Sequence, residues 1–310
     1  MIEQLKTIFE ESAKAGTGRL CVGFKDLVTG EEAYYNGDTV FPTASVYKTF
    51  VLCELFRREK EGTFSFSDTH TLLESDKSIG SGILEVIGEG AVLSMMDYAV
   101  LMMAISDNTA ADYLYQLVGP KAIHENVFQP LGMTNSLCNT EGRSLLNAYY
   151  GVTVEEYRRK DAAGERFHAH NGSYFRCEEP KNKQTTPADM IKLLSGLYSG
   201  TFTDPETDQR SLDVKHKCQS KLLMPAKLPA GVRIAHKTGS IDIWPTTAAL
   251  FIPTAAIMHW PCPTTAIWLR KTNMKAPPVW RRVHRFWASC RLTFTGSLPS
   301  TTNSDGGALL

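Results

Sequence analysis

The chain has 310 residues, of which 43 % are hydrophobic and 10 % aromatic, enough for one large globular domain or two ordinary ones. Lysine and arginine together number 33, and so do aspartate and glutamate. This balance provides no field that attracts nucleic acid or an anionic membrane, and no apolar run is long enough to span a bilayer. We therefore expect a small-molecule or uncharged partner.

The cysteines argue against a disulfide framework and against a zinc site. They are odd in number, widely spaced and never arranged as CxxC, so we expect reduced or buried thiols. The seven are Cys21, Cys53, Cys138, Cys177, Cys218, Cys262 and Cys290.

The N-terminal residues 1–16 predict an amphipathic helix, because Ile2, Leu5, Ile8 and Phe9 fall on one face. The segment lacks the apolar centre of a signal peptide. We expect either a cytoplasmic protein or a secreted one whose signal is missing from this chain. Alternating apolar residues over 19–36 then predict a β-hairpin.

Helical signals dominate the next part of the chain. Ser94-Met-Met-Asp97 has the pattern of a capping box, and Thr186-Pro187 is typical of a helix start. The helices that we expect cover residues 46–62, 94–105, 109–118 and 186–200. Residues 134–184 are polar and poorly periodic, which indicates a long loop of the kind that borders a site, and a strand signal returns at residues 231–236.

Ser45-Val-Tyr-Lys48 lies at the start of a predicted helix. A spacing of three residues places the Lys48 amine on the same face as the Ser45 hydroxyl, near the N–H groups of the helix N-terminus. A lysine whose pKa is depressed can take the proton of a serine and make it a nucleophile. Alone, the same pattern also fits a capping serine followed by a surface lysine.

Two further polar segments carry the same ambiguity. Ser106-Asp-Asn108 is either a turn between helices or part of a site, and His236-Lys-Thr-Gly-Ser240 ends a strand whose Lys and Thr side chains could bind a carboxylate. In this order and in these contexts, the three segments resemble the SxxK, SDN and KTG motifs of the class A β-lactamases and penicillin-binding proteins. The resemblance covers residues 1–242 and includes Gly80-Ser-Gly-Ile-Leu84 and Thr185-Thr-Pro-Ala-Asp-Met190.

The resemblance implies a two-lobe α/β fold of the serine β-lactamase type. Residues 1–43 and 200–242 would form an antiparallel sheet flanked by helices, and residues 44–199 an all-helical lobe. Together they would make one catalytic domain, residues 1–242, with the active site in the cleft between the lobes.

The resemblance also implies roles in acyl transfer. Ser45 would be the acylated nucleophile and Lys48 its base or proton relay. Ser106 would pass a proton to the leaving nitrogen, and Asn108 would hold the substrate amide.

A second group of residues would bind the substrate around the reacting carbonyl. Lys237 and Thr238 would bind its carboxylate, while Gly239 would let the substrate backbone approach. The backbone N–H groups of Ser45 and Ser240 would form an oxyanion hole.

The implied function is a serine hydrolase that opens β-lactam rings without a metal or an organic cofactor, acting as a monomer on a small β-lactam or peptide substrate. A D-Ala-D-Ala peptidase or an esterase that uses the same serine is an alternative. A β-lactam-binding sensor or pseudo-enzyme is another.

The carboxylate that activates the deacylating water is the weakest point of the resemblance. In place of the family's E-x-x-L-N run stands Glu141-Gly-Arg-Ser-Leu-Leu-Asn147, in which the acid lies two residues too far from Asn147. Glu141 is the best candidate, with rivals at Glu155, Glu156, Glu178 and Glu179. If no carboxylate reaches the ester, hydrolysis would be slow and the protein would act as a binding protein or sensor.

Two further features do not require a functional interpretation. His168-Ala-His170 has no partner spacing for a metal and is expected to be solvated. Asn171-Gly-Ser173 fits a glycosylation sequon, which matters only in a secreted eukaryotic protein.

Residues 243–310 depart from the family, in which a strand hairpin and a C-terminal helix follow the KTG segment. Six prolines occur from Pro245 to Pro278, and the last residues have the composition of a disordered segment. We expect an aberrant tail in place of the last strands and helix.

Our hypothesis for the tail is a slip of the reading frame near Ile243. Read from the third base of each codon, Trp244-Pro245 must encode Ala, and Met258-His-Trp-Pro261 must encode Ala-Leu-Ala. The offset frame thus contains a strand, a polar turn and a second strand, which is the hairpin that the family has here. A genuinely divergent tail is the alternative, and sequencing the gene distinguishes the two.

Overall fold

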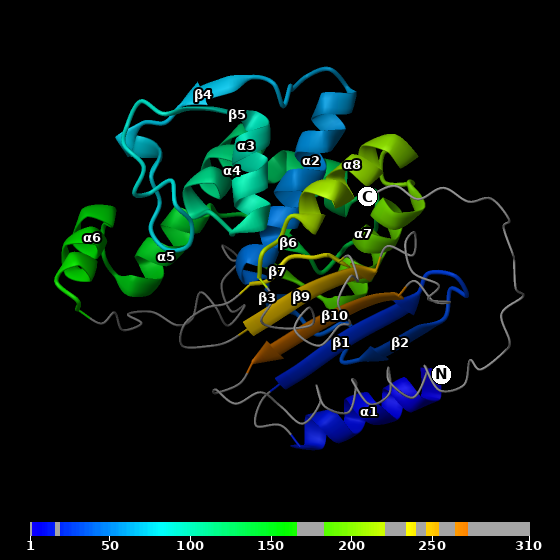
Figure 1. Cartoon of the computed structure of the whole chain (residues 1–310). Coiled ribbons are helices and arrows are strands. Elements are labelled where there is room, and N and C mark those ends of the chain that lie inside the picture. The colour runs from blue at the N-terminus through cyan, green and yellow to red at the C-terminus, as the bar shows by residue number, and fades with distance from the viewer. Residues whose placement is uncertain are drawn as a thin grey trace, which may run out of the picture.

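A computed structural model of the chain describes residues 2–15, 19–165, 183–220, 234–239, 246–253 and 264–271 (Figure 1). Several features named above lie outside these ranges, namely His168, His170, the sequon at Asn171, Glu178, Glu179 and Ser240. Within the described part, no helix is long and apolar enough to cross a membrane, and no group of three or more His, Cys, Asp or Glu side chains could hold a metal ion. Cys53, Cys138 and Cys218 are buried free thiols, as expected.

The central sheet is five-stranded and antiparallel, with the order β2-β1-β10-β9-β8. The hairpin predicted over residues 19–36 is confirmed, and Asp26 holds its turn by accepting the N–H groups of Val28 and Thr29 at 2.8 and 3.0 Å. The strands are β1 (Arg19–Asp26), β2 (Glu32–Tyr35), β8 (Ile234–Ala235), β9 (Thr246–Pro253) and β10 (Thr264–Lys271).

Strands β9 and β10 lie within residues 243–310, the part of the chain that we expect to be an aberrant tail. Each is eight residues long, and β10 pairs with β1 from Arg19↔Lys271 to Asp26↔Thr264. Both segments are rich in the β-branched and aromatic residues that favour strands. Their prolines fall at or outside the strand ends, where Pro253 closes β9 and Pro263 precedes β10, so the ladders are not broken.

Helices cover both faces of the sheet. The predicted N-terminal helix is α1 (Ile2–Ala15), which lies on the face away from the helical lobe and buries Leu5 and Phe9 (Figure 1). On the other face, α7 (Pro187–Ser199) contacts β1 and β10, and α8 (Pro205–His216) contacts β8. The fold is the two-lobe, antiparallel arrangement that the sequence predicts.

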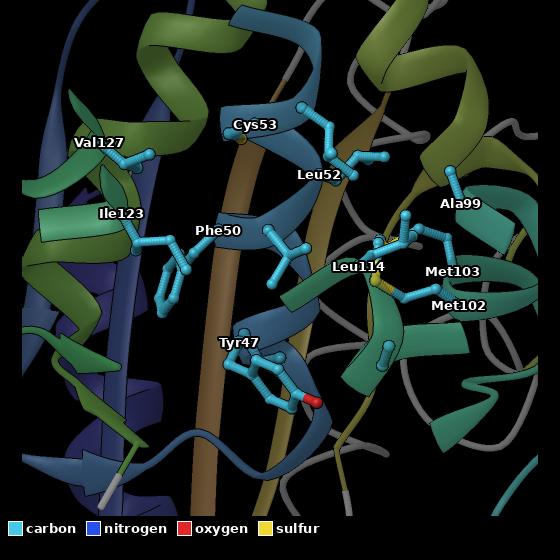
Figure 2. Packing of buried hydrophobic residues seen from close by; sticks show 14 of the residues in the cluster. Tyr47, Phe50, Leu52, Cys53, Ala99, Met102, Met103, Leu114, Ile123 and Val127 are labelled. Carbon is cyan, nitrogen blue, oxygen red and sulfur yellow. The ribbon is translucent and has the colours of Figure 1, made fainter. Parts of the chain in front are cut away.

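The helical lobe is packed around one central helix. Helix α2 (Lys48–Lys60) is buried along most of its length, and Figure 2 shows Phe50, Leu52 and Cys53 of this helix among residues of its neighbours. The Phe50 ring meets Phe128 edge to face with centroids 4.9 Å apart. A short 3₁₀ turn, η1 (Ala44–Tyr47), precedes it. The other helices here are α3 (Met95–Ala104), α4 (Asn108–Ile123), the π-helical turn η3 (His124–Phe128), α5 (Gly142–Tyr150), α6 (Val154–Ala162) and the 3₁₀ turn η2 (Glu74–Asp76).

Two small sheets complete this lobe. Strands β4 (Thr69–Thr71) and β5 (Val92–Ser94) form a pair. A three-stranded sheet has the order β3-β7-β6, built from β3 (Phe41–Pro42), β6 (Leu137–Cys138) and β7 (Lys183–Thr185). The second sheet links the segment before η1 to residues more than a hundred positions later.

The predicted helix caps are confirmed, whereas some helical segments were not predicted. Ser94 and Asp97 form the capping box of α3, and α7 begins after Thr186 and ends at Gly200. The helix predicted over residues 109–118 is interrupted at Gly119, where φ is 73°, as expected, and a second helical segment that was not predicted continues α4 to Ile123. The expected loop over residues 134–184 contains α5 and α6 in its described part.

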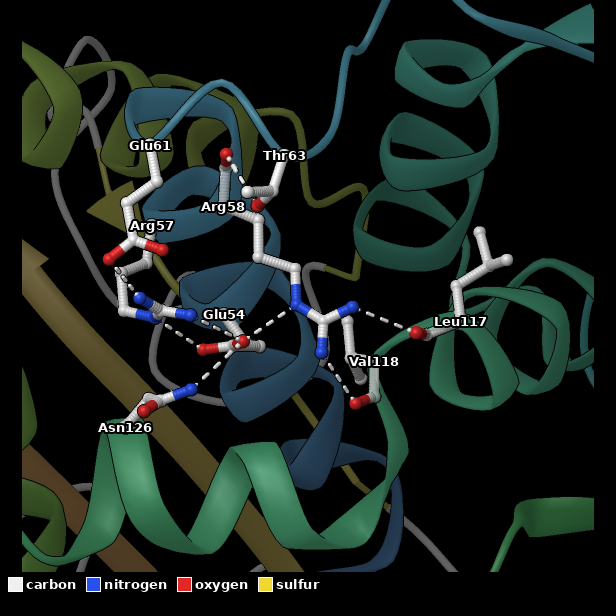
Figure 3. A network of polar contacts seen from close by, with 8 residues as sticks. All are labelled: Glu54, Arg57, Arg58, Glu61, Thr63, Leu117, Val118 and Asn126. Carbon is white, nitrogen blue, oxygen red and sulfur yellow. Dashed lines mark hydrogen bonds and ion pairs between the residues drawn. The ribbon is translucent and has the colours of Figure 1, made fainter.

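A polar network anchors the C-terminal half of α2 (Figure 3). The buried Glu54 carboxylate accepts hydrogen bonds from Arg57 and Arg58, and Asn126 of η3 adds another. Arg58 also donates to the carbonyl groups of Leu117 and Val118 in α4. Helix α2 is therefore fixed to its neighbours at the end opposite Lys48.

Candidate active site

Ser45 and Lys48 lie at the transition from η1 to α2. The Lys48 backbone N–H donates to the carbonyl groups of Ser45 and Val46, which closes a tight turn. Ser45 is half-buried, whereas the Lys48 side chain is fully buried. Ala44, directly before the serine, has a φ of 44°, a left-handed conformation that is costly for a residue with a side chain. The nucleophile candidate thus sits on a constrained turn.

The Lys48 amine reaches the predicted SDN segment. Its Nζ atom donates to the carbonyl oxygen of Ser106 at 2.6 Å, to the Ser106 hydroxyl at 3.1 Å and to Oδ1 of Asn108 at 2.7 Å. The carbonyl oxygen of Asp107 lies at 3.4 Å. The first and second motifs therefore meet directly through one amine.

Lys237 brings in the third motif from the opposite side. Its Nζ atom donates to the Ser106 hydroxyl at 2.9 Å and to the carbonyl oxygen of Thr238 at 2.7 Å. The Ser106 oxygen therefore accepts from the amines of Lys48 and Lys237 together. A hydroxyl in this position keeps its own proton available for a third group.

The pKa values of both amines are lowered. Burial, together with the neighbouring charge of Lys237, lowers the pKa of Lys48 well below its ordinary value, although Asp112 and Asp107 oppose this effect. Burial lowers the pKa of Lys237 to about 8. Burial beside a second cation therefore favours the free-amine form of Lys48, which makes it the candidate base of the pair, while Lys237 is the candidate cation.

The SDN segment is held in place by the loop that contains Gly80. Asn108 donates from Nδ2 to the carbonyl oxygen of Ile79 at 2.8 Å, and a Cβ atom at Gly80, where φ is 103°, would lie 2.7 Å from this nitrogen. Asp107 caps α4 at Ala110 and accepts the N–H of Ile83 at 2.6 Å. Asp107 thus holds the loop against α4, while the side chains of Ser106 and Asn108 contact Lys48.

Gly239 brings the strand end against the nucleophile. A Cβ atom added to Gly239 would lie 2.7 Å from the Thr43 carbonyl oxygen and 2.9 Å from both the Ala44 Cβ and the Ser45 backbone nitrogen. Only glycine allows this approach without a shift of the turn. The backbone that follows β8 is therefore in contact with the backbone of Ser45.

Glu141 lies at the N-terminus of α5. Its carboxylate accepts hydrogen bonds from Gln116 Nε2 at 3.0 Å and from the Ser144 hydroxyl at 2.8 Å, both at exposed positions. Burial would raise its pKa, but these hydrogen bonds and the charges of Arg143 and Lys183 hold the pKa below its ordinary value. Of the rivals in the described part, Glu155 and Glu156 lie in the first turn of α6.

Asp112 is a buried carboxylate that the sequence analysis did not select. It accepts the Ser78 hydroxyl at 2.7 Å and the backbone N–H groups of Gly142 and Arg143 at 2.6 and 2.8 Å, and the Tyr47 hydroxyl also donates to it. These four donors occupy the lone pairs of the carboxylate. Its place on α4, about one turn after Asn108, was a sequence signal that could have marked it.

The structure thus brings Lys48, Ser106, Asn108 and Lys237 into direct contact, with Ser45 and Gly239 adjacent through their backbones. Thr238 lies half-buried beside them. The contacts described for Glu141 join it to Gln116 and Ser144 instead. Such a cluster can deprotonate a serine, donate a proton to a leaving group and bind an anion.

Comparison with known sequences gives the family. A sequence model of the Beta-lactamase enzyme family matches residues 1–256. Beta-lactamase CARB-3 of Pseudomonas aeruginosa is 30 % identical over 242 residues, which make up 77 % of this chain and 72 % of the relative. Beta-lactamase PSE-4 of the same organism is 30 % identical over 123 residues, 39 % of this chain and 41 % of the relative.

Solved structures share the fold. A β-lactamase from Sphaerobacter thermophilus superposes with a TM-score of 0.73 at 21 % identity, covering 93 % of this chain and 98 % of the other. PBP-A gives a TM-score of 0.73 at 21 % identity, with coverage of 95 % and 97 %. An ancestral class A β-lactamase gives 0.71 at 22 % identity, with coverage of 93 % and 99 %. The match over residues 1–256 and the relative that is 30 % identical agree with this fold, so the chain belongs to the β-lactamase enzyme family and is a class A β-lactamase-like hydrolase.

Proposed function

We propose that the protein opens β-lactam rings through an acyl-enzyme on Ser45. The observation that carries this proposal is the position of the Ser106 hydroxyl, 3.1 Å from the Lys48 amine and 2.9 Å from the Lys237 amine. It connects the lysine that follows Ser45 by one helical turn to the lysine at the strand edge. A proton that Lys48 takes from Ser45 can therefore be passed on to the Ser106 hydroxyl.

In the acylation step, Lys48 accepts the Ser45 proton directly or relays it. The Ser45 oxygen attacks the lactam carbonyl carbon, and a bond forms between them. When the carbon–nitrogen bond of the ring breaks, Ser106 delivers a proton to the nitrogen and is reprotonated by Lys48. Positioned acid–base groups of this kind contribute about 10²- to 10⁴-fold to the rate.

The residues that follow β8 provide most of the substrate contacts. Lys237 and Thr238 bind the substrate carboxylate, and Asn108 holds its amide. The N–H groups of Ser45 and Ser240 form the oxyanion hole, and the close approach of Gly239 to the Ser45 nitrogen supports this arrangement. Each such donor contributes about 3 kcal/mol to transition-state stabilisation.

Each lobe supplies part of the reacting groups. Residues 1–43 and 200–242 form the α/β lobe that supplies Lys237, and residues 44–199 form the helical lobe that supplies Ser45, Lys48 and Ser106. The reacting groups come together where these parts of the catalytic domain, residues 1–242, meet.

Water then hydrolyses the ester, and we assign its activation to Glu141, with Glu155, Glu156, Glu178 and Glu179 as rivals. The hydrogen bonds of Glu141 to Gln116 and Ser144 mean that it must turn away from these partners to act. Slow deacylation would make the protein a penicillin-binding protein or sensor. PBP-A, whose fold this chain shares, has a point mutant solved as an acyl-enzyme complex with penicillin G.

The test mixes the purified protein with a chromogenic cephalosporin and follows absorbance and intact mass together. Continuous turnover that disappears in Ser45→Ala supports hydrolysis. A stable mass adduct lost in the same variant supports the binding protein, and hydrolysis of a D-Ala-D-Ala peptide or a simple ester supports the alternatives. Ser199→Ala, at an exposed position in α7, is the matched control, and neither turnover nor adduct in the wild type would refute the proposal.

The deacylating residue has its own test. Glu141→Gln should leave the rate of adduct formation unchanged and extend the lifetime of the adduct at least tenfold. If Glu155→Gln or Glu156→Gln has this effect instead, the assignment to Glu141 is wrong.

A further inference from the structure

A buried lysine that the proposed chemistry does not use lies behind the nucleophile. Lys183 is in β7, the middle strand of the β3-β7-β6 sheet, and only 2 % of it is exposed. Burying an ammonium group is costly unless other groups compensate for the lost water. The contacts of this side chain therefore need a physical explanation.

The Lys183 ammonium lies on an aromatic surface. Its Nζ atom is 3.3 Å from the ring centroid of Tyr47 and 5.3 Å from that of Tyr115, and the two rings meet edge to face with centroids 6.3 Å apart. A cation over an aromatic face is attracted by the negative charge of the ring face, and more strongly where water is excluded. Tyr47 directly precedes Lys48, and its buried side chain helps to anchor the turn in the core.

The backbone of Lys183 reaches the other end of the same turn. Its carbonyl oxygen accepts hydrogen bonds from the Thr43 N–H at 2.9 Å and from the Thr43 hydroxyl at 3.3 Å. One residue thus holds both Thr43 and Tyr47, which flank Ser45. On the other side, Gly239 packs against Ala44 and Ser45, so the left-handed turn at Ala44 is clamped between two segments.

Charged groups connect Lys183 to the reacting amine. Burial lowers its pKa to about 8, opposed by Cys138, Asp112 and Glu141, so that it is mostly charged at neutral pH. Cys138 is its direct partner across β6 and β7.

Besides burial, the charges of four neighbouring residues shift the pKa of Lys48. Lys237 and Lys183 lower its pKa, while Asp112 and Asp107 raise it. The charge of Lys183 therefore favours the free-amine form of Lys48.

We propose that Lys183 is a positioning residue for acylation. Its ammonium group lies over the Tyr47 ring, and its carbonyl oxygen accepts hydrogen bonds from Thr43. Together these contacts hold the turn that presents Ser45 to the Lys48 amine. This inference rests on the proposed acylation of Ser45. It assigns Lys183 no contact with the substrate.

The test replaces the charge while keeping the length and apolar stem of the side chain. Lys183→Met should slow adduct formation about tenfold, and the rising limb of the pH–acylation profile should move up by roughly one pH unit, because Lys48 loses a neighbouring positive charge. Lys183→Arg, which keeps the cation, should restore most of the rate and return the limb toward its original position. Lys192→Met, on the exposed side of α7, is the control.

A readout without turnover separates this inference from the proposed function. The Cε carbon of Lys48 is followed by NMR titration in the wild type and in Lys183→Met, and the signal is assigned by its loss in Lys48→Met. An upward shift of the midpoint is expected even if no β-lactam reacts. A wild type without an adduct refutes the acylation proposal alone. An unchanged midpoint together with an unchanged adduct rate refutes the role of Lys183.

A purely structural role is also distinguishable. It would lower the thermal midpoint of Lys183→Met and reduce the rate only in proportion to the folded fraction, with the pH limb unmoved, and that outcome would overturn the proposal. If Lys183→Met does not fold, Tyr47→Phe and Tyr47→Leu replace it. The phenylalanine keeps the ring and should retain more of the acylation rate than the leucine, and equal rates would contradict the proposal.

Discussion

Removing the Glu54 carboxylate should destabilise the fold without touching the reacting groups. Its side chain is 0 % exposed, and its two oxygens accept two hydrogen bonds from Arg57, one from Arg58 and one from Asn126 (Figure 3). These bonds tie the end of α2 to η3 and, through Arg58, to α4. The Glu54→Ala substitution leaves their donors without this acceptor.

The magnitude follows from what remains of the network. Breaking a buried ion pair by removing one partner costs about 3 to 5 kcal/mol. Here Arg57 and Arg58 are 22 % and 26 % exposed, and Arg58 keeps its bonds to the Leu117 and Val118 carbonyls, so we expect about 3 kcal/mol, the low end of that range. With a urea dependence of about 3 kcal/mol per molar, the midpoint falls by about 1 M.

The assay is urea unfolding at neutral pH, with Glu61→Ala as the control. Glu61 pairs with the same Arg57 but is 52 % exposed, so its loss should cost no more than about 0.5 kcal/mol. Equal effects of the two substitutions, or a cost below about 1 kcal/mol for Glu54→Ala, would refute the reasoning. The rate of adduct formation per folded molecule should not change.

The stabilisation that Glu54 provides should depend on pH. Burial alone would raise the pKa of Glu54, but hydrogen bonds from Arg57 and Arg58 outweigh it and hold the pKa below its ordinary value. Stability that comes from a lowered carboxyl pKa is present above the unfolded-state value and is lost as the pH falls through the folded-state value. The difference in stability between wild type and Glu54→Ala should therefore shrink in acid, and a constant difference would contradict this account.

Four further outcomes are expected. Lys48→Met should slow adduct formation about 10²- to 10³-fold, and the wild-type rate should rise with pH through the lowered pKa of Lys48, because the free amine is the active form; stopped-flow mixing checks both. Gly239→Ala, whose Cβ would lie 2.9 Å from the Ser45 nitrogen, should slow the same reaction at least about tenfold with little change in thermal midpoint. Asp112→Asn should cost about 2 kcal/mol in thermal unfolding, because an amide N–H then faces backbone N–H donors. Gene sequencing should show a slip near Ile243, and an uninterrupted frame with a soluble, active product would contradict that hypothesis.

Features set by neighbouring residues were predictable from the sequence. The capping box of Ser94 and Asp97 and the Thr186 cap use contacts only a few positions apart, so the local pattern contains all the partners. The same holds for the turn of the first hairpin, which depends on Asp26 and the N–H groups just after it. Even there, the continuation of α4 beyond Gly119 was missed, because Pro120 is acceptable in the first turn of a resumed helix.

Helices α5 and α6 could not be predicted, because their stability comes from elsewhere. The start of α5 is held by the Asp112 carboxylate, thirty residues earlier, which accepts the N–H groups of Gly142 and Arg143, and Arg158 of α6 pairs with Glu74 and Glu85. The place of Lys183 is equally non-local, since β7 meets β3 and β6 only in the folded chain. Motif matching selects residues that touch the substrate, and the residues that hold them in place carry no motif.

Strands β9 and β10, which follow Ile243, connect the C-terminal part of the sequence to the candidate active site. Strand β1 has buried Leu20, Val22 and Phe24, and it needs a partner on the side opposite β2, which β10 supplies along its whole length. Strand β9 in turn contacts η1, the turn that carries Ser45. Backbone pairing asks only for residues that tolerate an extended conformation, so residues from either reading frame can occupy this place. Because β9 lies against η1, the reading frame beyond Ile243 nevertheless sets which residues support the turn of the nucleophile.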